Sequence, residues 1–191
     1  MIHLNKKGFY CPKPICDNNN NYLQELMRKP AMIVNFLEGK SKHNITIDDC
    51  FQVGLSMGLM HSCSSDFQVK RYNSLSITGW QKLIKNCINT IPLSVLNKLQ
   101  PNLMKDLQNS FDFFLRFWPH DLEKGFIHGD LFPDNVFFID GKITGIIDFY
   151  FSCTDILTYD LAIAVNAWCF DKKNNFQEQK YQALLNGYNS K

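Results

Sequence analysis

The segment that most constrains this chain is a short apolar hairpin centred on the dipeptide Asp140-Gly141. A type I′ turn needs positive φ at both central residues, and Asp-Gly is one of the pairs that tolerates this. The flanking runs, VFFI and KITGII, are rich in the β-branched and aromatic residues that strands favour. We therefore expect two antiparallel strands in which Ile139 opposes Lys142. An isolated glycine within a strand often marks a β-bulge, which we expect near Gly145.

Oxygen-bearing side chains gather at the open end of this hairpin. Asn135 precedes the first strand and Asp148 follows the second, so strand pairing would bring the two residues together. Amide and carboxylate oxygens suit Mg²⁺, a hard cation that takes few protein ligands and keeps waters and phosphate oxygens. Asp130 lies five residues before Asn135, on the loop that enters the hairpin. There it could accept the proton of a substrate hydroxyl or hold that hydroxyl in line for attack.

The other polar residues of this segment have simpler interpretations. We expect His128 to brace the loop by hydrogen bonding, and we assign Asp134 no role beyond that of a solvated loop acid. The competing interpretation of the whole segment is a capped turn with surface acids. The pattern H-x-D-x-x-x-x-N, followed 13 residues later by the aspartate of IIDF, is ordered enough to favour a catalytic site.

Hydrophobic patterns predict several further elements. Residues 31–39, AMIVNFLEG, form a short apolar run that predicts a buried strand, and CPKPICDNNNNY before it is expected to be loop. Thr46 and Asp49 form a capping-box pattern that opens a helix, on which Val53, Met57 and Met60 share one face. Helices are also expected over residues 101–117, over DLAIAVNAWCF, which is apolar almost all round and so should be buried, and over KYQALLNGYNSK.

Composition narrows the class of protein. A chain of 191 residues suffices for one packed domain or a large piece of two. The net charge of +2, with scattered basic residues, gives no case for nucleic-acid binding. No apolar run is long enough to span a bilayer and no secretory signal is visible. Seven cysteines without a C-x-x-C indicate reduced thiols. We expect a cytoplasmic protein with no nucleic-acid or membrane partner.

Three short features favour ordinary structural roles over chemistry. GLSMG (residues 54–58) fits the nucleophile elbow G-x-S-x-G, but Ser56 falls inside the predicted helix with no strand before it. We interpret Ser56 as a small residue that lets helices approach. GKS (residues 39–41) resembles the end of a P-loop, yet Val34 stands where that loop requires glycine. For the lone His61 we expect a capping or surface role.

The segments HGDLFPDNV and IIDFYF resemble the catalytic and metal-binding loops of the protein-kinase-like superfamily, in its aminoglycoside/choline phosphotransferase branch. PAMIVNFLEG, RYNSLSITGW and YDLAIAVNAWCF are, in order and spacing, similar to bacterial homoserine kinases of that branch. The resemblance implies an α+β, protein-kinase-like fold, mostly the helical C-lobe with a remnant of the N-lobe sheet and a catalytic β-hairpin. Residues 1–38 would form that remnant and the hinge, and residues 39–191 the C-lobe.

The resemblance also implies an activity, the phosphorylation of the L-homoserine hydroxyl in threonine biosynthesis, with ATP and Mg²⁺ as cofactors. Asp130 would be the catalytic aspartate, and Asn135 and Asp148 would hold Mg²⁺ on the ATP phosphates. Asp160 would be a structural acid that supports the catalytic loop or caps a helix. The backbone of the hinge, Asn35, Phe36 and Leu37, would meet adenine. Candidate pocket residues for the amino acid are Arg71, Asn73, Tyr150, Asp155 and Trp168; for these, ordinary packing is an equal alternative.

The chain departs from the kinase pattern before the hinge. A kinase fold has a Gly-rich loop over the phosphates, a lysine on strand β3 and a glutamate on helix αC, and no such set precedes residue 39 here. Residues 1–7 resemble the last turn of that helix. We therefore expect an N-terminally truncated copy with weak or no activity alone. The alternatives are a phosphotransferase for another small hydroxyl acceptor, such as choline, a sugar or an aminoglycoside, and a non-catalytic kinase-like fragment.

Overall fold

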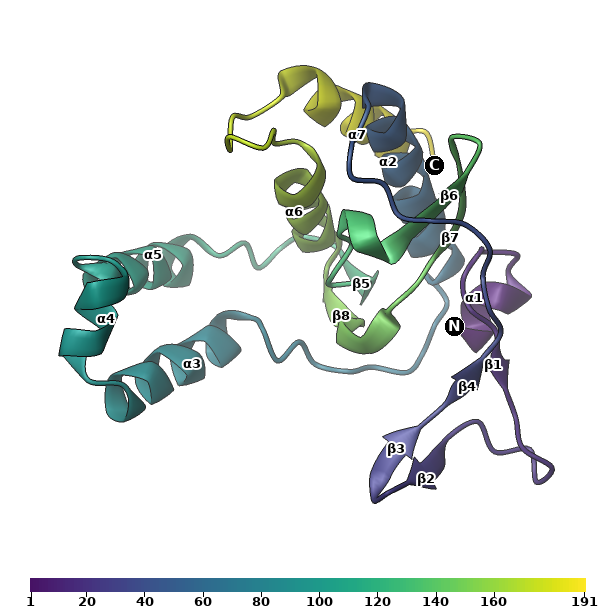
Figure 1. Ribbon diagram of the computed structural model, residues 1–191, viewed down its shortest axis with the longest axis horizontal. Helices are drawn as coiled ribbons and strands as arrows, with labels where there is room; N and C mark the ends of the chain where they lie inside the picture. The colour runs from purple at the N-terminus through teal and green to yellow at the C-terminus, as the bar shows by residue number, and fades with distance from the viewer. The chain divides into compact units, whose positions relative to one another are not determined.

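The computed structural model describes all residues 1–191 and has an α+β architecture, as expected (Figure 1). Contacts divide the chain into two compact units. Unit 1 comprises Met1–Arg71 and Glu123–Lys191, and unit 2 is the intervening segment Tyr72–Leu122. The lobe boundary expected at residues 38 and 39 is a different division and stays a prediction.

Unit 1 holds short antiparallel strand pairs and most of the long helices. Its elements are α1 (Ile2–Lys6), β1 (Pro14–Ile15), β2 (Gln24–Leu26), β3 (Lys29–Ala31), β4 (Ile33–Val34), α2 (Ile47–Cys63), β5 (Lys124–Ile127), β6 (Val136–Ile139), β7 (Lys142–Ile146), β8 (Cys153–Ile156), α6 (Leu157–Trp168) and α7 (Glu178–Asn189), with 3₁₀ turns at Pro133–Asn135 and Phe149–Phe151. The strands pair as β1 with β4, β2 with β3, β5 with β8 and β6 with β7.

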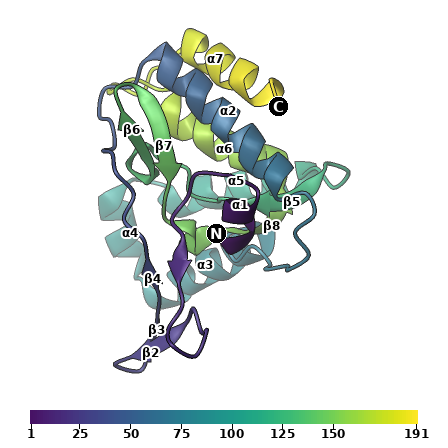
Figure 2. The same cartoon turned by 90° about the vertical axis from the view of Figure 1, so that its right-hand side faces the viewer.

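The core of unit 1 lies among α2, α6 and α7, which run side by side next to the β6–β7 hairpin (Figure 2). The predicted start of α2 is confirmed. The Thr46 side chain accepts the Asp49 N–H, and the Asp49 carboxylate accepts the Thr46 N–H, which completes a capping box. The expected apolar face of α2 is fully buried, at Val53, Met57 and Met60.

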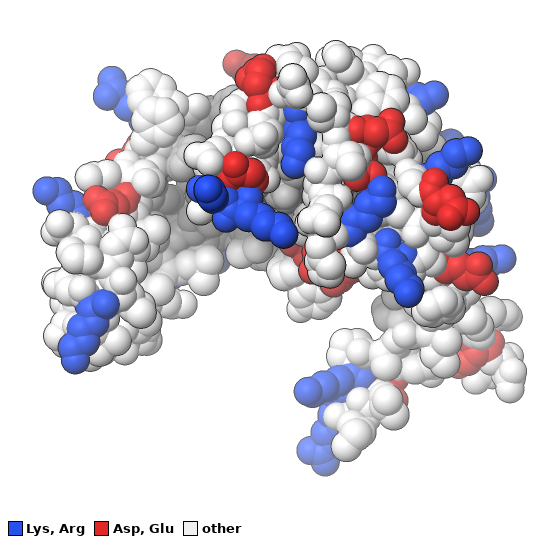
Figure 3. Space-filling model, turned by 45° about the horizontal axis from the view of Figure 1, so that its top comes forward, with Lys and Arg blue, Asp and Glu red and all other residues white.

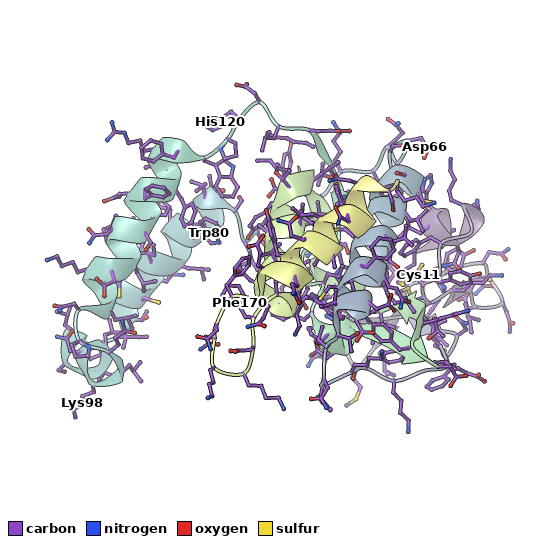
Figure 4. All side chains as sticks on the ribbon, turned by 90° about the horizontal axis from the view of Figure 1, so that it is seen from above. Cys11, Asp66, Trp80, Lys98, His120 and Phe170 are labelled. Carbon is purple, nitrogen blue, oxygen red and sulfur yellow. The ribbon has the colours of Figure 1, made fainter.

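Glycines set the unusually close approach of α2 to α7 (Figure 4). A Cβ at Gly54 would lie 2.0 Å from the carbonyl oxygen of Leu184, and one at Gly187 would lie 2.0 Å from that of Phe51. A Cβ at Gly58 would lie 2.8 Å from the carbonyl oxygen of Tyr188. In GLSMG the two glycines therefore make the helix contact that we expected of the serine, which lies inside α2.

The β6–β7 hairpin has the predicted turn and register. Asp140 and Gly141 have φ of 48° and 79°, as a type I′ turn requires, and Ile139 pairs with Lys142. The register shifts between Phe137, which pairs with Gly145, and Phe138, which pairs with Ile143. This irregularity is the β-bulge that the isolated glycine predicted.

The prediction of a buried strand over residues 31–39 is wrong. Only Ile33 and Val34 form β4, and both are exposed, Ile33 at 69%. The strand belongs to a two-stranded sheet with β1, so pairing holds its backbone while its side chains face outward. β1 lies inside the segment expected to be loop, with Pro14 opposite Val34. A proline fits such an edge strand because it has no N–H to donate.

The β2–β3 hairpin turns through two residues that rarely adopt the left-handed region. Met27 and Arg28 have φ of 52° and 62°, between the paired residues Leu26 and Lys29. Such backbone angles bring an L-residue's Cβ too close to the following carbonyl oxygen.

Helix α6 has one exposed side, so the expectation that it is buried all round is wrong. Asp160, Ala164 and Trp168 are buried at helical spacing, whereas Ala162 and Asn166 are exposed. Alanine is small enough to be tolerated on either face of a helix. The apolar composition of this segment therefore overestimated the burial of α6. The final predicted helix is confirmed as α7.

Unit 2 consists of three helices, α3 (Ile77–Thr90), α4 (Leu93–Leu99) and α5 (Leu103–Phe117). The helix predicted over residues 101–117 is confirmed as α5, which begins after a left-handed Asn102. Trp80 of α3, labelled in Figure 4, packs edge-on against Phe114 and Trp118, with ring centroids 5.7 and 5.5 Å apart. Phe111 is the buried residue of α5.

The two residues that flank unit 2, Arg71 and Glu123, are hydrogen-bonded close to one strand of unit 1. Unit 2 is therefore an inserted segment. The Thr154 N–H donates to the carbonyl oxygen of Arg71 at 2.7 Å, and the Leu157 N–H donates to that of Glu123 at 3.0 Å. Thr154 belongs to β8, and Leu157 directly follows it. The chain therefore leaves and re-enters unit 1 along the same short stretch.

The surface carries mixed charges, and the cysteines form no disulfide. Lys and Arg are interspersed with Asp and Glu on the face in Figure 3. All seven cysteines are free thiols, as predicted. None of the helices has the length and apolar character needed to cross a membrane.

Candidate active site

Asp160 anchors the loop that carries the candidate catalytic residues. It lies on α6, and its fully buried carboxylate accepts the N–H groups of His128 and Gly129, both at 2.9 Å. Burial alone would raise the pKa of Asp160, but the hydrogen bond from His61, the neighbouring imidazoles and the Gly129 N–H together hold it below its usual value. The prediction that Asp160 supports this loop is confirmed.

His61 extends this network, so the expectation of a capping or surface role is wrong. Its ring is buried, with Nε2 3.1 Å from Asp160 Oδ2 and Nδ1 2.9 Å from the hydroxyl of Tyr188 on α7. His61 follows Met57 by four residues and Gly54 by seven, on the buried face of α2. That spacing was the signal in the sequence that could have indicated burial.

His128 braces the loop as predicted. It is fully buried, its Nε2 lies 2.9 Å from the carbonyl oxygen of Ile147, and its Nδ1 accepts the Asp130 N–H at 3.3 Å. Because a carbonyl oxygen can only accept, the ring proton is on Nε2. The imidazole thus ties Asp130 to the residue before Asp148.

Asp130 and Asn135 are joined directly. Asn135 Nδ2 donates to the backbone oxygen of Asp130 at 2.8 Å and to its carboxylate at 3.2 Å. Because the amide nitrogen is occupied in this way, Oδ1 is the atom of the Asn135 amide that could accept or ligate. Burial raises the pKa of Asp130 above its usual value, and the charges of Asp148 and Asp134 raise it further.

Asp148 lies at the open end of the hairpin, where the Ile147 N–H donates to the Asn135 carbonyl oxygen at 3.0 Å. It is exposed and left-handed, with φ of 59°, and its Oδ1 accepts the Tyr150 N–H at 3.3 Å. The chain offers no cluster of three or more His, Cys, Asp and Glu side chains that could hold a metal ion. One amide oxygen and one carboxylate fit a cation such as Mg²⁺, which keeps most of its ligands from water and phosphate.

A cavity of about 620 Å³ adjoins this end of the hairpin. Its walls come from residues 34–37 and 147–150, with Met1, Pro12, Met32 and Phe137. The three expected hinge residues, Asn35, Phe36 and Leu37, therefore line the same cavity as Asp148. The Asn35 N–H donates to the Lys13 carbonyl oxygen at 3.0 Å, which extends the β1–β4 pairing to the first of these residues. Gly145 lets Leu37 approach, because a Cβ there would lie 2.6 Å from Leu37 Cδ1.

The residues expected to bind the amino acid do not all lie in one place. Tyr150 lines the cavity and is 71% exposed, and Arg71 contacts the Tyr150 backbone. Asp155 lies on β8, where its carboxylate accepts the Ile156 N–H. Asn73 belongs to unit 2, where it accepts the Leu75 N–H before α3.

For Trp168 the packing alternative holds. Its side chain is fully buried in the core and donates from Nε1 to the Leu131 carbonyl oxygen at 2.8 Å. A large aromatic residue on the buried face of α6 serves packing, and its ring nitrogen needs a buried acceptor.

Curated relatives resemble the whole chain. Proteins named homoserine kinase from Brucella ovis and from Brucella suis are each 40% identical to it over 193 residues, which cover 100% of this chain. The chain spans only 57% of the length of these relatives.

Solved structures share the fold at low identity. An amicoumacin kinase in complex with AMP-PNP, Ca²⁺ and Ami superposes with a TM-score of 0.75 at 16% identity, over 98% of this chain and 58% of that one. An aminoglycoside-3′-phosphotransferase of type VIII superposes with a TM-score of 0.71 at 16% identity, over 99% of this chain and 69% of that one.

These neighbours confirm the kinase-like fold that the motifs implied. The sequence profile described as the phosphotransferase enzyme family matches residues 1–190, which is nearly the full sequence. The chain therefore belongs to the phosphotransferase enzyme family.

Proposed function

We propose that the protein represented by this chain is a homoserine kinase that transfers the γ-phosphoryl group of ATP to the hydroxyl of L-homoserine. The observation that carries the proposal is the meeting of Asp130, Asn135 and Asp148 beside a cavity lined by the hinge. The acceptor is inferred from the curated relatives, which are similar to this chain from end to end. The same hinge, at residues 35–37, supports the proposed lobe boundary after residue 38.

The chemistry assigned to each residue follows from its surroundings. Asp130 would take the proton of the acceptor hydroxyl as that oxygen bonds to the γ-phosphorus and the bond to the β-phosphate oxygen breaks. A raised pKa suits this role, because the carboxylate becomes a better proton acceptor. Asn135 Oδ1 and Asp148 would hold Mg²⁺, which when bound neutralises charge on the phosphates.

Residues around Tyr150 would bind the acceptor and the nucleotide. Backbone groups of Asn35, Phe36 and Leu37 would meet adenine in the cavity. Arg71 and Tyr150, which lie together, are the proposed contacts for the amino acid, with Asp155 as a third. A reaction that consumes ATP, in a chain with seven free thiols, fits a cytoplasmic location.

The first test is nucleotide binding by the purified chain, measured by titration calorimetry with AMP-PNP in the presence and absence of Mg²⁺. We expect binding that Mg²⁺ strengthens and that Asp148→Asn weakens. The matched control is Asp171→Asn, which alters an aspartate of a loop outside the site. Nucleotide binding that is the same with and without Mg²⁺ would contradict the proposed metal site. The absence of nucleotide binding would contradict the proposed nucleotide cavity.

The second test identifies the acceptor through ADP release. L-Homoserine should stimulate release more than choline, a simple sugar or an aminoglycoside, and Asp130→Asn should abolish the stimulation. We expect turnover below the roughly 1–100 per second that is usual for kinases. Stimulation by another acceptor alone would keep the phosphotransferase and replace the substrate.

A further inference from the structure

Arg71 is fixed at the point where the chain leaves unit 1 for unit 2. Its carbonyl oxygen accepts the Thr154 N–H at 2.7 Å, so its backbone is tied to β8. β8 begins two residues after the 3₁₀ turn Phe149–Phe151, which itself follows Asp148. The attachment therefore places Arg71 against the segment that carries the candidate metal ligand.

The side chain of Arg71 holds that turn from outside. Nη1 donates to the carbonyl oxygen of Tyr150 at 2.6 Å and reaches that of Ser152 at 3.4 Å. The guanidinium carbon lies 5.9 Å from the centroid of the Tyr150 ring, within range of a cation–π contact. A charged donor on a main-chain carbonyl makes one of the stronger hydrogen bonds of proteins.

Asp148 holds the same turn from the other end. Its Oδ1 accepts the Tyr150 N–H at 3.3 Å, while the carbonyl of that same residue is bound by Arg71. The left-handed backbone of Asp148 is a conformation that persists only where neighbouring contacts fix it. Arg71 supplies such a contact two residues further on, at the carbonyl of Tyr150.

We infer that Arg71 is a positioning residue, which holds the Phe149–Phe151 turn so that the Asp148 carboxylate is oriented for the metal ion. The metal part of this inference rests on the proposed function. It goes beyond a role for Arg71 as a ligand of the acceptor's carboxylate, since that contact would use the other N–H groups of the guanidinium. The two roles affect different measurements, because one changes the order of the turn and the other changes only acceptor affinity.

The positioning role is tested without any ligand, by hydrogen–deuterium exchange of residues 149–154. In Arg71→Ala we expect the amides of Tyr150 and Ser152 to exchange on the order of tenfold faster than in the wild type. Arg71→Lys should fall between the two, because lysine keeps one donor but not the planar fork. The control is Arg116→Ala, which removes an exposed arginine of unit 2 that stacks on Phe117. Unchanged exchange in Arg71→Ala would overturn the inference.

The link to the metal is tested by Mn²⁺ binding in the presence of AMP-PNP, followed by electron paramagnetic resonance. Arg71→Ala should weaken Mn²⁺ binding on the order of tenfold. Metal-free AMP-PNP binding should weaken less, because only Phe149 and Tyr150 of the turn line the cavity. Normal Mn²⁺ affinity together with a raised KM for L-homoserine alone would overturn the link and make Arg71 an acceptor ligand. If the wild type binds no metal nucleotide while exchange still accelerates in the variant, the proposed function fails and the positioning role stands.

Discussion

Substitution of Gly54 by alanine separates helix propensity from helix packing, because the two predict opposite results. In an isolated helix this change stabilises by about 1 kcal/mol. In this protein the added Cβ would lie 2.0 Å from the Leu184 carbonyl oxygen. Ordinary van der Waals contact begins near 3.4 Å, so the helices would have to move apart by 3.4 − 2.0 = 1.4 Å. Backbone atoms of α7 cannot yield as a flexible side chain could.

The change in the free energy of unfolding combines the cost of overpacking with the gain in helix propensity. Overpacking of a core costs about 1–3 kcal/mol, and an obstacle made of backbone corresponds to the upper end. Subtracting about 1 kcal/mol for propensity leaves a net loss of about 2 kcal/mol for Gly54→Ala. Gly187→Ala should lose a similar amount, because its Cβ would also lie 2.0 Å from a carbonyl oxygen. Gly58→Ala needs a shift of only 3.4 − 2.8 = 0.6 Å, so the two terms nearly cancel.

Urea denaturation followed by far-ultraviolet circular dichroism measures the three free energies of unfolding. A loss of about 2 kcal/mol corresponds to a melting temperature lower by about 4–8 °C for a chain of this size. Ser56→Ala is the matched control in the same helix, and its effect should stay within about 0.5 kcal/mol. Gly54→Ala at least as stable as the wild type would refute the packing argument, as would a larger loss at Gly58 than at Gly54.

Three further predictions concern buried charge, pH and backbone strain. Asp160→Ala should cost about 3–5 kcal/mol in urea denaturation, because His128, Gly129 and His61 lose their shared buried acceptor; a loss below about 1 kcal/mol would contradict this. Burial above all raises the pKa of Asp130, so the folded chain binds this proton more tightly than the unfolded chain and ionisation costs stability as the pH rises. Asp130→Asn should therefore stabilise the protein near neutral pH, and the gain should vanish below about pH 4; a gain that is the same at both pH values would exclude that cause. Replacing Met27 with Asn and Arg28 with Gly should relieve left-handed strain of up to about 1–2 kcal/mol per residue and slow hydrogen exchange in the β2–β3 hairpin; unchanged exchange would show that the turn is not strained.

Local chemistry made part of this structure predictable. The Asp140-Gly141 turn and the Thr46–Asp49 capping box depend on residues within a few positions of one another, and both form as expected. The hairpin register then brings Asn135 close to the residue before Asp148. For this reason the arrangement of the candidate metal ligands followed from the sequence.

The remaining features depend on partners far along the chain. His61 is buried because Asp160 and Tyr188 meet it from α6 and α7. Gly54 contributes to packing because Leu184 approaches it. The apolar residues of β4 suggested that the strand is buried. It pairs only with β1, and its side chains are exposed. A sequence pattern indicates which face of an element is apolar, but not whether another element covers that face.

The attachment of the inserted segment has a consequence for how such a chain can diverge. Thr154 and Leu157, which bind the flanking residues Arg71 and Glu123, are three positions apart, or about 10 Å along an extended chain. Because N–H groups an odd number of residues apart point to opposite edges of a strand, the gap between Arg71 and Glu123 also includes two strand spacings of about 4.8 Å each. A linker of about five residues could span it, so α3, α4 and α5 could be removed or exchanged without rerouting the rest of the backbone. Unit 1, with Asp130, Asn135 and Asp148, would then keep its fold and its candidate site, while residues 72–122 could vary. A trimmed chain that folds with the same hydrogen-exchange pattern around Asp160 would establish this modularity.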